Sequence, residues 1–247
     1  MFNLGGWEWL ILLVICLLPV VTAAAVVALL VLLARRPSSP ARRPPEEAPA
    51  PAAPLRDTLA AFRWRNEPTS WRLEDALEIR TDPDTDYWQR THYGFRRDNG
   101  HFFYTKLTGD FTIAARFTIE PTAQYDQCGL MCRVDGDTWV KCAAEYETAE
   151  FAHLGSVVTN LGYSDWATQE LPATARDLRY RLDRRGSDFR LSWSTGSRSW
   201  QQMRIFHLHN CPATLEAGIC ACSPTGPGFD CQVREFWVGP NEWFAGT

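Results

Sequence analysis

Several short motifs that mark common enzymes are missing from this 247-residue chain. It holds no glycine-rich phosphate loop, no Walker motif, no nucleophile elbow and no dinucleotide-binding fingerprint. An excess of basic residues is missing too, since the formal net charge is -4, and we therefore expect no nucleic-acid partner. Paired Cys-x2-Cys knuckles are also absent, and we expect neither a metal nor a cofactor.

The number of cysteines in the globular part does not allow all of them to form disulfide bonds with one another. Seven of the eight cysteines follow residue 100, and an odd number excludes complete disulfide pairing within one domain. Reduced thiols in the cytoplasm fit this count. The spacings Cys128-x3-Cys132 and His207-x-His209-x-Cys211 loosely suggest zinc, but core thiols explain most of these cysteines more simply.

Charge is absent from the segment Trp9–Ala34. As a helix this segment would be about 39 Å long, enough to cross a hydrocarbon core of about 30 Å, so we expect residues 9–34 to contact the lipid bilayer. Four arginines follow at positions 35, 36, 42 and 43, whereas Glu8 is the one charged side chain before the segment. This bias predicts a single-pass membrane protein with its N-terminus outside and its globular domain in the cytoplasm. The alternative is a signal peptide cleaved near Thr22–Ala25, which the missing basic n-region disfavours.

Composition divides the chain into three parts. Residues 1–36 form the predicted anchor, and residues 37–56 form a linker rich in proline and alanine that cannot bury a core. Fully extended, the stretch from Pro37 to Pro54 spans about 55 Å. Residues 57–247 form one globular domain, whose size is enough to bury a core without disulfides or metals.

The globular part shows many short alternating segments and no long helical pattern. It is rich in aromatic residues, with most of the chain's 11 Trp and 13 Phe. Strands are predicted at Phe111–Ile119, Cys128–Val134, Trp139–Glu145, Ser156–Asn160, Tyr180–Arg184, Phe189–Ser194, Gln202–His207, Leu215–Cys222 and Cys231–Val238. We therefore predict an all-β fold, a two-sheet antiparallel sandwich, behind one N-terminal transmembrane α-helix.

The two sides of the hairpin around Asp135-Gly136-Asp137 differ in character. Because side chains alternate across a strand, one apolar side is expected in the core: Cys128, Leu130, Cys132, Val134, Val140, Cys142, Ala144 and Tyr146. The other side carries Gln127, Gly129, Met131, Arg133, Trp139, Lys141, Ala143 and Glu145. An indole, an ammonium, a carboxylate and an amide on one face suit a groove for a carbohydrate-like ligand. The alternative is a polar outer face with one half-exposed tryptophan.

Longer motifs in the same region resemble a known family. They are Tyr125-Asp126-Gln127-Cys128-Gly129-Leu130-Met131-Cys132-Arg133-Val134, Trp139-Val140-Lys141, Ser164-Asp165-Trp166, Asp86-Tyr87-Trp88, Tyr93-Gly94-Phe95 and Asn99-Gly100-His101-Phe102. Together they resemble a bacterial and fungal family numbered 1349 among the domains of unknown function, over about residues 64–238. The resemblance implies a concanavalin A-like lectin/glucanase jelly roll, and it implies no established activity.

Other residues extend the candidate site. Trp88 and His101 are expected at the rim of the groove, and Asp165 and Trp166 are expected in a loop where such residues often line a ligand. The alternatives are a tryptophan packed over the sandwich edge, with the neighbouring aspartate capping a turn, and a histidine that satisfies a local backbone group.

The functional prediction is a membrane-anchored, non-catalytic binding module for a carbohydrate-like ligand or a protein partner. Two alternatives remain open. One is a glycoside hydrolase using Glu145 and Glu147, whose spacing resembles that of retaining glucanases, although an acidic loop is the simpler interpretation. The other is a scaffold or accessory subunit of a membrane complex.

Overall fold

A computed structural model of the chain describes residues 54–196 and 199–243. The expected anchor at residues 9–34 and all but the end of the linker lie outside this range. Among the described residues, no helix has the length and apolar character needed to cross a membrane. The described part is all-β, with one short helix, α2 (Leu55–Thr58), so the predicted fold class is confirmed for this part.

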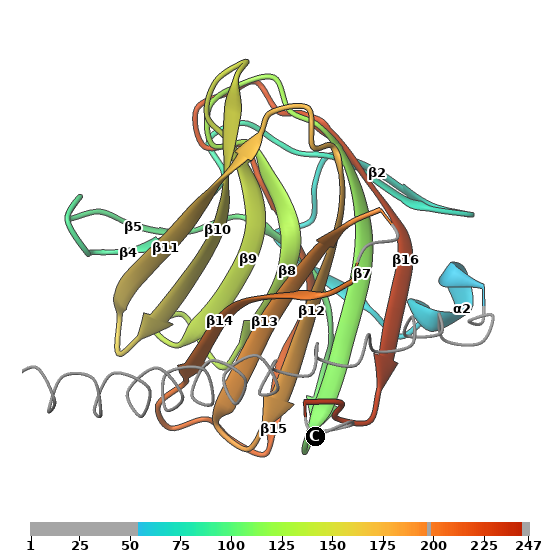
Figure 1. The fold of residues 1–247 in the computed structure, drawn as a ribbon, viewed down its shortest axis with the longest axis vertical. Helices are drawn as coiled ribbons and strands as arrows, with labels where there is room; N and C mark the ends of the chain where they lie inside the picture. Colours follow the sequence, from blue (N-terminus) through green and yellow to red (C-terminus); the bar gives the residue numbers. More distant parts are fainter. Residues whose placement is uncertain (1–53, 197–198, 244–247) are drawn as a thin grey trace, which may run out of the picture. The chain divides into compact units, whose positions relative to one another are not determined.

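Two antiparallel sheets of seven strands each make up the fold (Figure 1). The first sheet has the order β1 (Arg63–Arg65), β6 (His101–Thr108), β15 (Thr214–Cys222), β8 (Gln127–Arg133), β9 (Trp139–Tyr146), β10 (Phe151–Asn160) and β11 (Tyr163–Pro172). The second has the order β14 (Gln201–His207), β13 (Asp188–Thr195), β12 (Asp177–Arg185), β7 (Phe111–Glu120), β16 (Asp230–Gly239), β3 (Leu77–Arg80) and β2 (Ser70–Leu73). A separate hairpin pairs β4 (Tyr87–Gln89) with β5 (Arg96–Asp98).

The nine strands expected from alternation are all present, but the strands β1 to β6 and β11 were not predicted. The strand predicted from Ser156 begins earlier, at Phe151. Asp165 and Trp166 lie within β11, so the prediction of a loop there is wrong. Because β11 is an edge strand and most of its side chains are exposed, its sequence lacks the apolar alternation of the inner strands.

The main core lies between the two sheets. It includes Leu130 and Val140 of the β8–β9 hairpin, packed in one cluster with Ile113 and Leu182 of the second sheet. Each fully buried side chain of this size contributes roughly 1.5–3 kcal/mol. The apolar side of the hairpin was therefore assigned to the core correctly from Cys128 to Cys132 and from Val140 to Ala144, whereas Val134 and Tyr146 are only half-buried.

The opposite side of the first sheet, called the distal face below, carries a second buried cluster. Its members are Tyr87, Trp88, Phe102, Tyr104, Met131, Trp139, Val157, Cys220 and Cys222. The segment that contains β4 and β5 folds back over this face, and Tyr87 packs against Trp139 with ring centroids 5.9 Å apart. Gly100 permits this contact, because a Cβ there would lie 2.4 Å from the Tyr87 ring. The half of the distal face near Trp139 is consequently closed to solvent.

A candidate ligand pocket on the distal face

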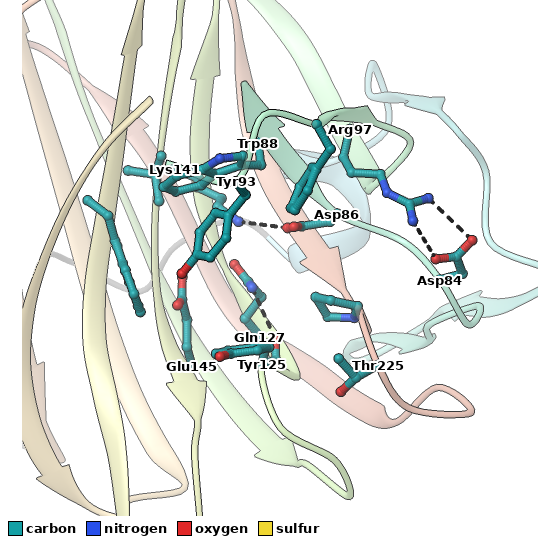
Figure 2. Close-up of a pocket in the computed structure, with 14 residues that line it drawn as sticks. Asp84, Asp86, Trp88, Tyr93, Arg97, Tyr125, Gln127, Lys141, Glu145 and Thr225 are labelled. Atoms are coloured by element: carbon teal, nitrogen blue, oxygen red, sulfur yellow. Dashed lines mark hydrogen bonds and ion pairs between the residues drawn. The ribbon is translucent and has the colours of Figure 1, made fainter. Parts of the chain in front are cut away.

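The half of the distal face farther from Trp139 holds a cavity of about 290 Å³ (Figure 2). Strands β8, β9, β10 and β11 form its floor, and the β4–β5 segment and the loop after β15 form its walls. The lining residues are Asp84, Asp86, Trp88, Tyr93, Phe95, Arg97, Tyr125, Gln127, Lys141, Glu145, Val157, Trp166, Pro224 and Thr225. They combine five aromatic rings with five ionisable side chains of opposite signs, the mixture typical of a small-molecule site.

A tight loop between β4 and β5 presents aromatic rings at the cavity. Arg90 and Gly94 both have positive φ, of 56° and 74°, and the Gly94 N–H donates to the Arg90 carbonyl at 2.7 Å. This turn places Tyr93 and Phe95 in a stacked pair with centroids 5.6 Å apart, and Tyr93 also meets Trp88 edge to face at 5.4 Å. Tyr93 is 52% exposed, so a large aromatic surface faces solvent beside the cavity. Large exposed rings in such a position are typical of a ligand contact rather than of a folding core.

Two ion pairs belong to the cavity lining. The Lys141 ammonium lies 3.1 Å from Asp86 Oδ1, and the Arg97 guanidinium lies 3.0 Å from Asp84 Oδ1 (Figure 2). Burial, the largest single effect, lowers the pKa of Lys141, but Asp86 together with Cys222, Glu145 and Cys220 raises it, and the pKa lies above its usual value. Lys141 is therefore a charged and already paired group, which holds the β4 segment against β9.

Two polar atoms in the lining have no hydrogen-bond partner. The Gln127 amide donates from Nε2 to the Tyr125 carbonyl at 3.0 Å, which leaves its buried Oε1 without a donor (Figure 2). The buried Trp166 Nε1 has no acceptor. Leaving a buried polar group unpaired costs about 1–3 kcal/mol, so these two atoms offer one acceptor and one donor to whatever occupies the cavity.

Glu145 is a further polar residue of the lining. Glu145 is only 5% exposed, and its carboxyl group has no hydrogen bond or ion pair within the described part of the chain. Burial raises the pKa of Glu145 to about 7; Lys141 opposes this shift, and Asp86 and Glu147 add to it. The carboxyl group therefore changes its protonation near neutral pH, as groups at functional sites often do.

Gly155 on β10 leaves the room in which Glu145 and Trp166 meet. A Cβ at this position would lie 3.2 Å from Glu145 Oε1 and 3.1 Å from Trp166 Nε1. The Glu145 carboxyl and the Trp166 N–H thus both approach Gly155 without forming a hydrogen bond with each other. Glycine is needed here for space and not for its backbone, because its φ is not positive.

Of the sequence-predicted site residues, the structure brings Gln127, Lys141, Glu145, Trp88 and Trp166 to the cavity. It does not bring the other four there.

Trp139 and Arg133 are the first two of these. Trp139 is 0% exposed and donates its indole N–H to the Gly136 carbonyl at 3.2 Å, so the prediction that it stacks on a ligand is wrong. Arg133 is buried and makes two hydrogen bonds with Asp98, at 2.7 and 2.8 Å. The β4–β5 segment covers the end of the sheet where both residues lie. Trp139 packs against Tyr87 of this segment, and Arg133 binds Asp98 of it.

His101 and Asp165 also have other roles. The His101 ring accepts from the Asp82 N–H at 2.9 Å and donates from Nδ1 to the Asn66 carbonyl at 2.6 Å. Burial lowers its pKa, so it is a neutral structural bridge between two backbone segments. The Asp165 carboxylate pairs with Arg204 at 2.6 Å and lies beside an adjacent, shallower hollow.

Glu147, the predicted catalytic partner of Glu145, does not line the cavity. Its two carboxylate oxygens contact His153 Nδ1 at 3.0 Å and Gln124 Nε2 at 2.8 Å. Five lining residues whose side chains matter here were not predicted from the sequence: Asp86, Tyr93, Phe95, Arg97 and Tyr125. Asp86, Tyr93, Phe95 and Tyr125 lie in the quoted family motifs, and Tyr93 and Phe95 flank a glycine, which was the available signal of an exposed aromatic loop.

Comparison with known proteins identifies relatives of the described domain. "Regulation of enolase protein 1" of Saccharomyces cerevisiae is 33% identical over 179 residues, which are 72% of this chain and 89% of the yeast protein. A solved structure of a functionally unknown S. cerevisiae protein is similar with a TM-score of 0.69 and 31% identity, over 74% of this chain and 97% of that one. A Bacillus licheniformis GH43 protein, BlXynB, is similar in fold alone, with a TM-score of 0.56 and 16% identity over 73% of this chain and 37% of that chain. The family model described as "Protein of unknown function (DUF1349)" matches residues 64–241, and the chain therefore belongs to this family.

Proposed function

We propose that this protein is a membrane-anchored, non-catalytic binding module whose distal-face cavity holds a small carbohydrate-like ligand, on a sandwich of the concanavalin A-like jelly-roll type. The observation that carries the proposal is a pair of unsatisfied buried polar atoms in one aromatic-lined cavity, Gln127 Oε1 and Trp166 Nε1. Beside them lies the Glu145 carboxyl, which has no hydrogen bond or ion pair within the described residues.

The chemistry of a sugar ring fits this set. A sugar has an apolar face that contacts aromatic rings and several hydroxyls that each donate and accept a hydrogen bond. The rings of Tyr93 and Phe95 supply the aromatic surface, while Gln127 and Trp166 supply one acceptor and one donor. A volume of about 290 Å³ lies at the small end of ligand cavities, which favours a monosaccharide or a similar metabolite over a polymer.

A pair of tryptophan variants tests this proposal. Titration of the full chain in detergent micelles with neutral monosaccharides, followed by saturation-transfer NMR, should detect binding. Trp166→Phe keeps a ring but removes the unpaired N–H, and we expect affinity to fall roughly 2- to 10-fold. Trp71→Phe is the control, because Trp71 lies on β2 and outside the cavity lining, and its Nε1 donates to Glu67. No binding of any sugar, or equal loss in both variants, would contradict the proposal.

Membrane anchoring is part of the same proposal and rests on the sequence. The uncharged segment Trp9–Ala34 and the arginines that follow it support a single span with the globular domain in the cytoplasm. A cytoplasmic domain meets few polysaccharides, which again favours a small sugar metabolite. Carbonate extraction of membranes should leave the chain in the pellet, and protease added outside intact cells should spare the domain. Release by carbonate would contradict the anchor, and cleavage from outside would contradict the orientation.

A second candidate function, glycoside hydrolysis, draws support from one observation. A carboxyl group with a pKa near 7 suits a general acid, as Glu145 would be. Against it, the Glu147 carboxylate is held by two other side chains, and Asp86 is paired with Lys141. Hydrolysis of aryl glycosides by the parent chain that disappears in Glu145→Gln would establish this function in place of the first. Sugar binding without turnover would exclude it.

A further inference from the structure

The charges of the cavity lining do not cancel. The lining contains three acidic side chains and two basic ones: Asp84, Asp86, Glu145, Arg97 and Lys141. Arg97 pairs with Asp84, and Lys141 pairs with Asp86, so both cations are already neutralised by carboxylates. The remaining carboxyl group, that of Glu145, has no cation of its own within the described residues.

A buried carboxyl group without a partner is costly when it ionises. Taking a carboxylate out of water is unfavourable unless a charge or several donors replace the lost water. Lys141 fills this role only in part: it lowers the pKa of Glu145, but its ammonium is 3.1 Å from Asp86 and forms no ion pair with Glu145. An incoming cation would supply the missing charge.

The walls around Glu145 also suit a cation. The cavity is lined by the rings of Trp88, Tyr93, Phe95 and Trp166, together with Tyr125. The faces of aromatic rings carry partial negative charge and attract ammonium groups within about 6 Å. Rings around a buried carboxylate are therefore more favourable for an organic cation than for a neutral polar group. An anionic ligand would meet Glu145 and the two carboxylates of the ion pairs, which disfavours acidic sugars and phosphates.

We propose that the cavity selects a ligand bearing an ammonium group, of the class of amino sugars, with Glu145 as its counterion. This inference rests on the proposed function, because the sugar ring would use Gln127 and Trp166 while the ammonium group uses Glu145. It names the class of ligand that the binding site prefers.

Three sugars that share one ring but differ in charge can show whether the ammonium group or the shape of the ring determines affinity. Calorimetry with the full chain in detergent micelles would compare glucosamine, glucose and N-acetylglucosamine, of which only the first carries an ammonium group. We expect glucosamine to bind roughly 10- to 100-fold more tightly than glucose, as for hydrogen bonds to a charged group. N-acetylglucosamine has a nitrogen at the same position without the charge, and it should not bind more tightly than glucose.

A matched pair of charge-removing variants assigns the effect to Glu145. Glu145→Gln keeps the size of the side chain and should reduce the ratio of glucosamine affinity to glucose affinity to within about twofold. Glu150→Gln also removes one negative charge, from an exposed residue in the turn after β9, and should keep the preference.

The outcomes distinguish this inference from the function on which it rests. If glucose and glucosamine bind equally well to the parent chain, the preference for an ammonium group is refuted and the carbohydrate site stands. If glucosamine is preferred but Glu145→Gln leaves the preference intact, the role of Glu145 is refuted. If none of the three sugars binds, and no other neutral sugar does, the proposed function itself fails.

Discussion

The strongest prediction concerns the stability of the fold when Glu145 is replaced by glutamine. The carboxyl group is buried on β9 and has no hydrogen-bond partner within the described residues. Folding raises its pKa from the usual 4.5 to about 7, mainly because burial disfavours the charged form. Glutamine has nearly the same shape and never ionises, so the substitution removes the cost of the charge without opening a cavity.

The sign and the size of the effect follow from this shift. Below pH 4.5 the carboxyl is protonated in both the folded and the unfolded chain, and its ionisation has no effect on stability. Between pH 4.5 and about 7 the unfolded chain loses this proton first, so the free energy of unfolding of the parent falls as the pH rises. One pKa unit corresponds to about 1.4 kcal/mol, and the total loss from this group is about 3 kcal/mol.

Urea unfolding of the full chain in detergent micelles, followed by tryptophan fluorescence, would measure this difference. Relative to the parent, Glu145→Gln should gain about 3 kcal/mol in the free energy of unfolding between pH 4.5 and pH 8. Glu150→Gln should follow the parent at every pH, because Glu150 is exposed. A constant difference between Glu145→Gln and the parent across this range would refute the argument, since it would mean that the carboxyl is not shifted by folding.

Three further substitutions test the structural roles assigned above. Trp139→Ala should destabilise the domain by about 3–5 kcal/mol in the same unfolding assay, because a fully buried indole is lost, and a cost below about 1 kcal/mol would show that the site is open to water. His101→Leu removes two hydrogen bonds to backbone groups and should cost about 1–3 kcal/mol with no change in sugar binding; a weaker affinity would return His101 to the binding site. Gly155→Val places a side chain between Glu145 and Trp166, so calorimetry should show sugar binding lost while circular dichroism retains the β signal; unchanged affinity would place the ligand elsewhere.

Much of the fold was predictable because alternation along a strand is a local property. Leu130 and Val140 belong to an apolar set at every second position, whereas the positions between them mix apolar, polar and charged residues, and this contrast placed one side of the β8–β9 hairpin in the core. Strand β11 was not predicted because it lacks this alternation. It lies at a sheet edge with most side chains exposed, so Asp165 and Trp166 gave no alternating signal.

The candidate site was predictable in part. The side of the hairpin that bears Gln127, Lys141 and Glu145 was recognised from its mixture of residue types, and all three line the cavity. Asp86, by contrast, could not be placed, because its ion pair with Lys141 joins positions 55 residues apart in the sequence. No periodicity in either segment indicates that contact.

The sequence by itself determined that the domain is a β-sandwich, which hairpin side faces its core, and that an uncharged segment long enough to span a bilayer precedes it. Only the tertiary structure decided which part of the distal face is a site. Trp139 and Glu145 lie on the same side of the same strand, yet one is sealed beneath Tyr87 while the other lines a cavity. The difference arises because the distant β4–β5 segment folds back over one end of the strand, where its rings and ion pairs pack, and leaves the other end hollow.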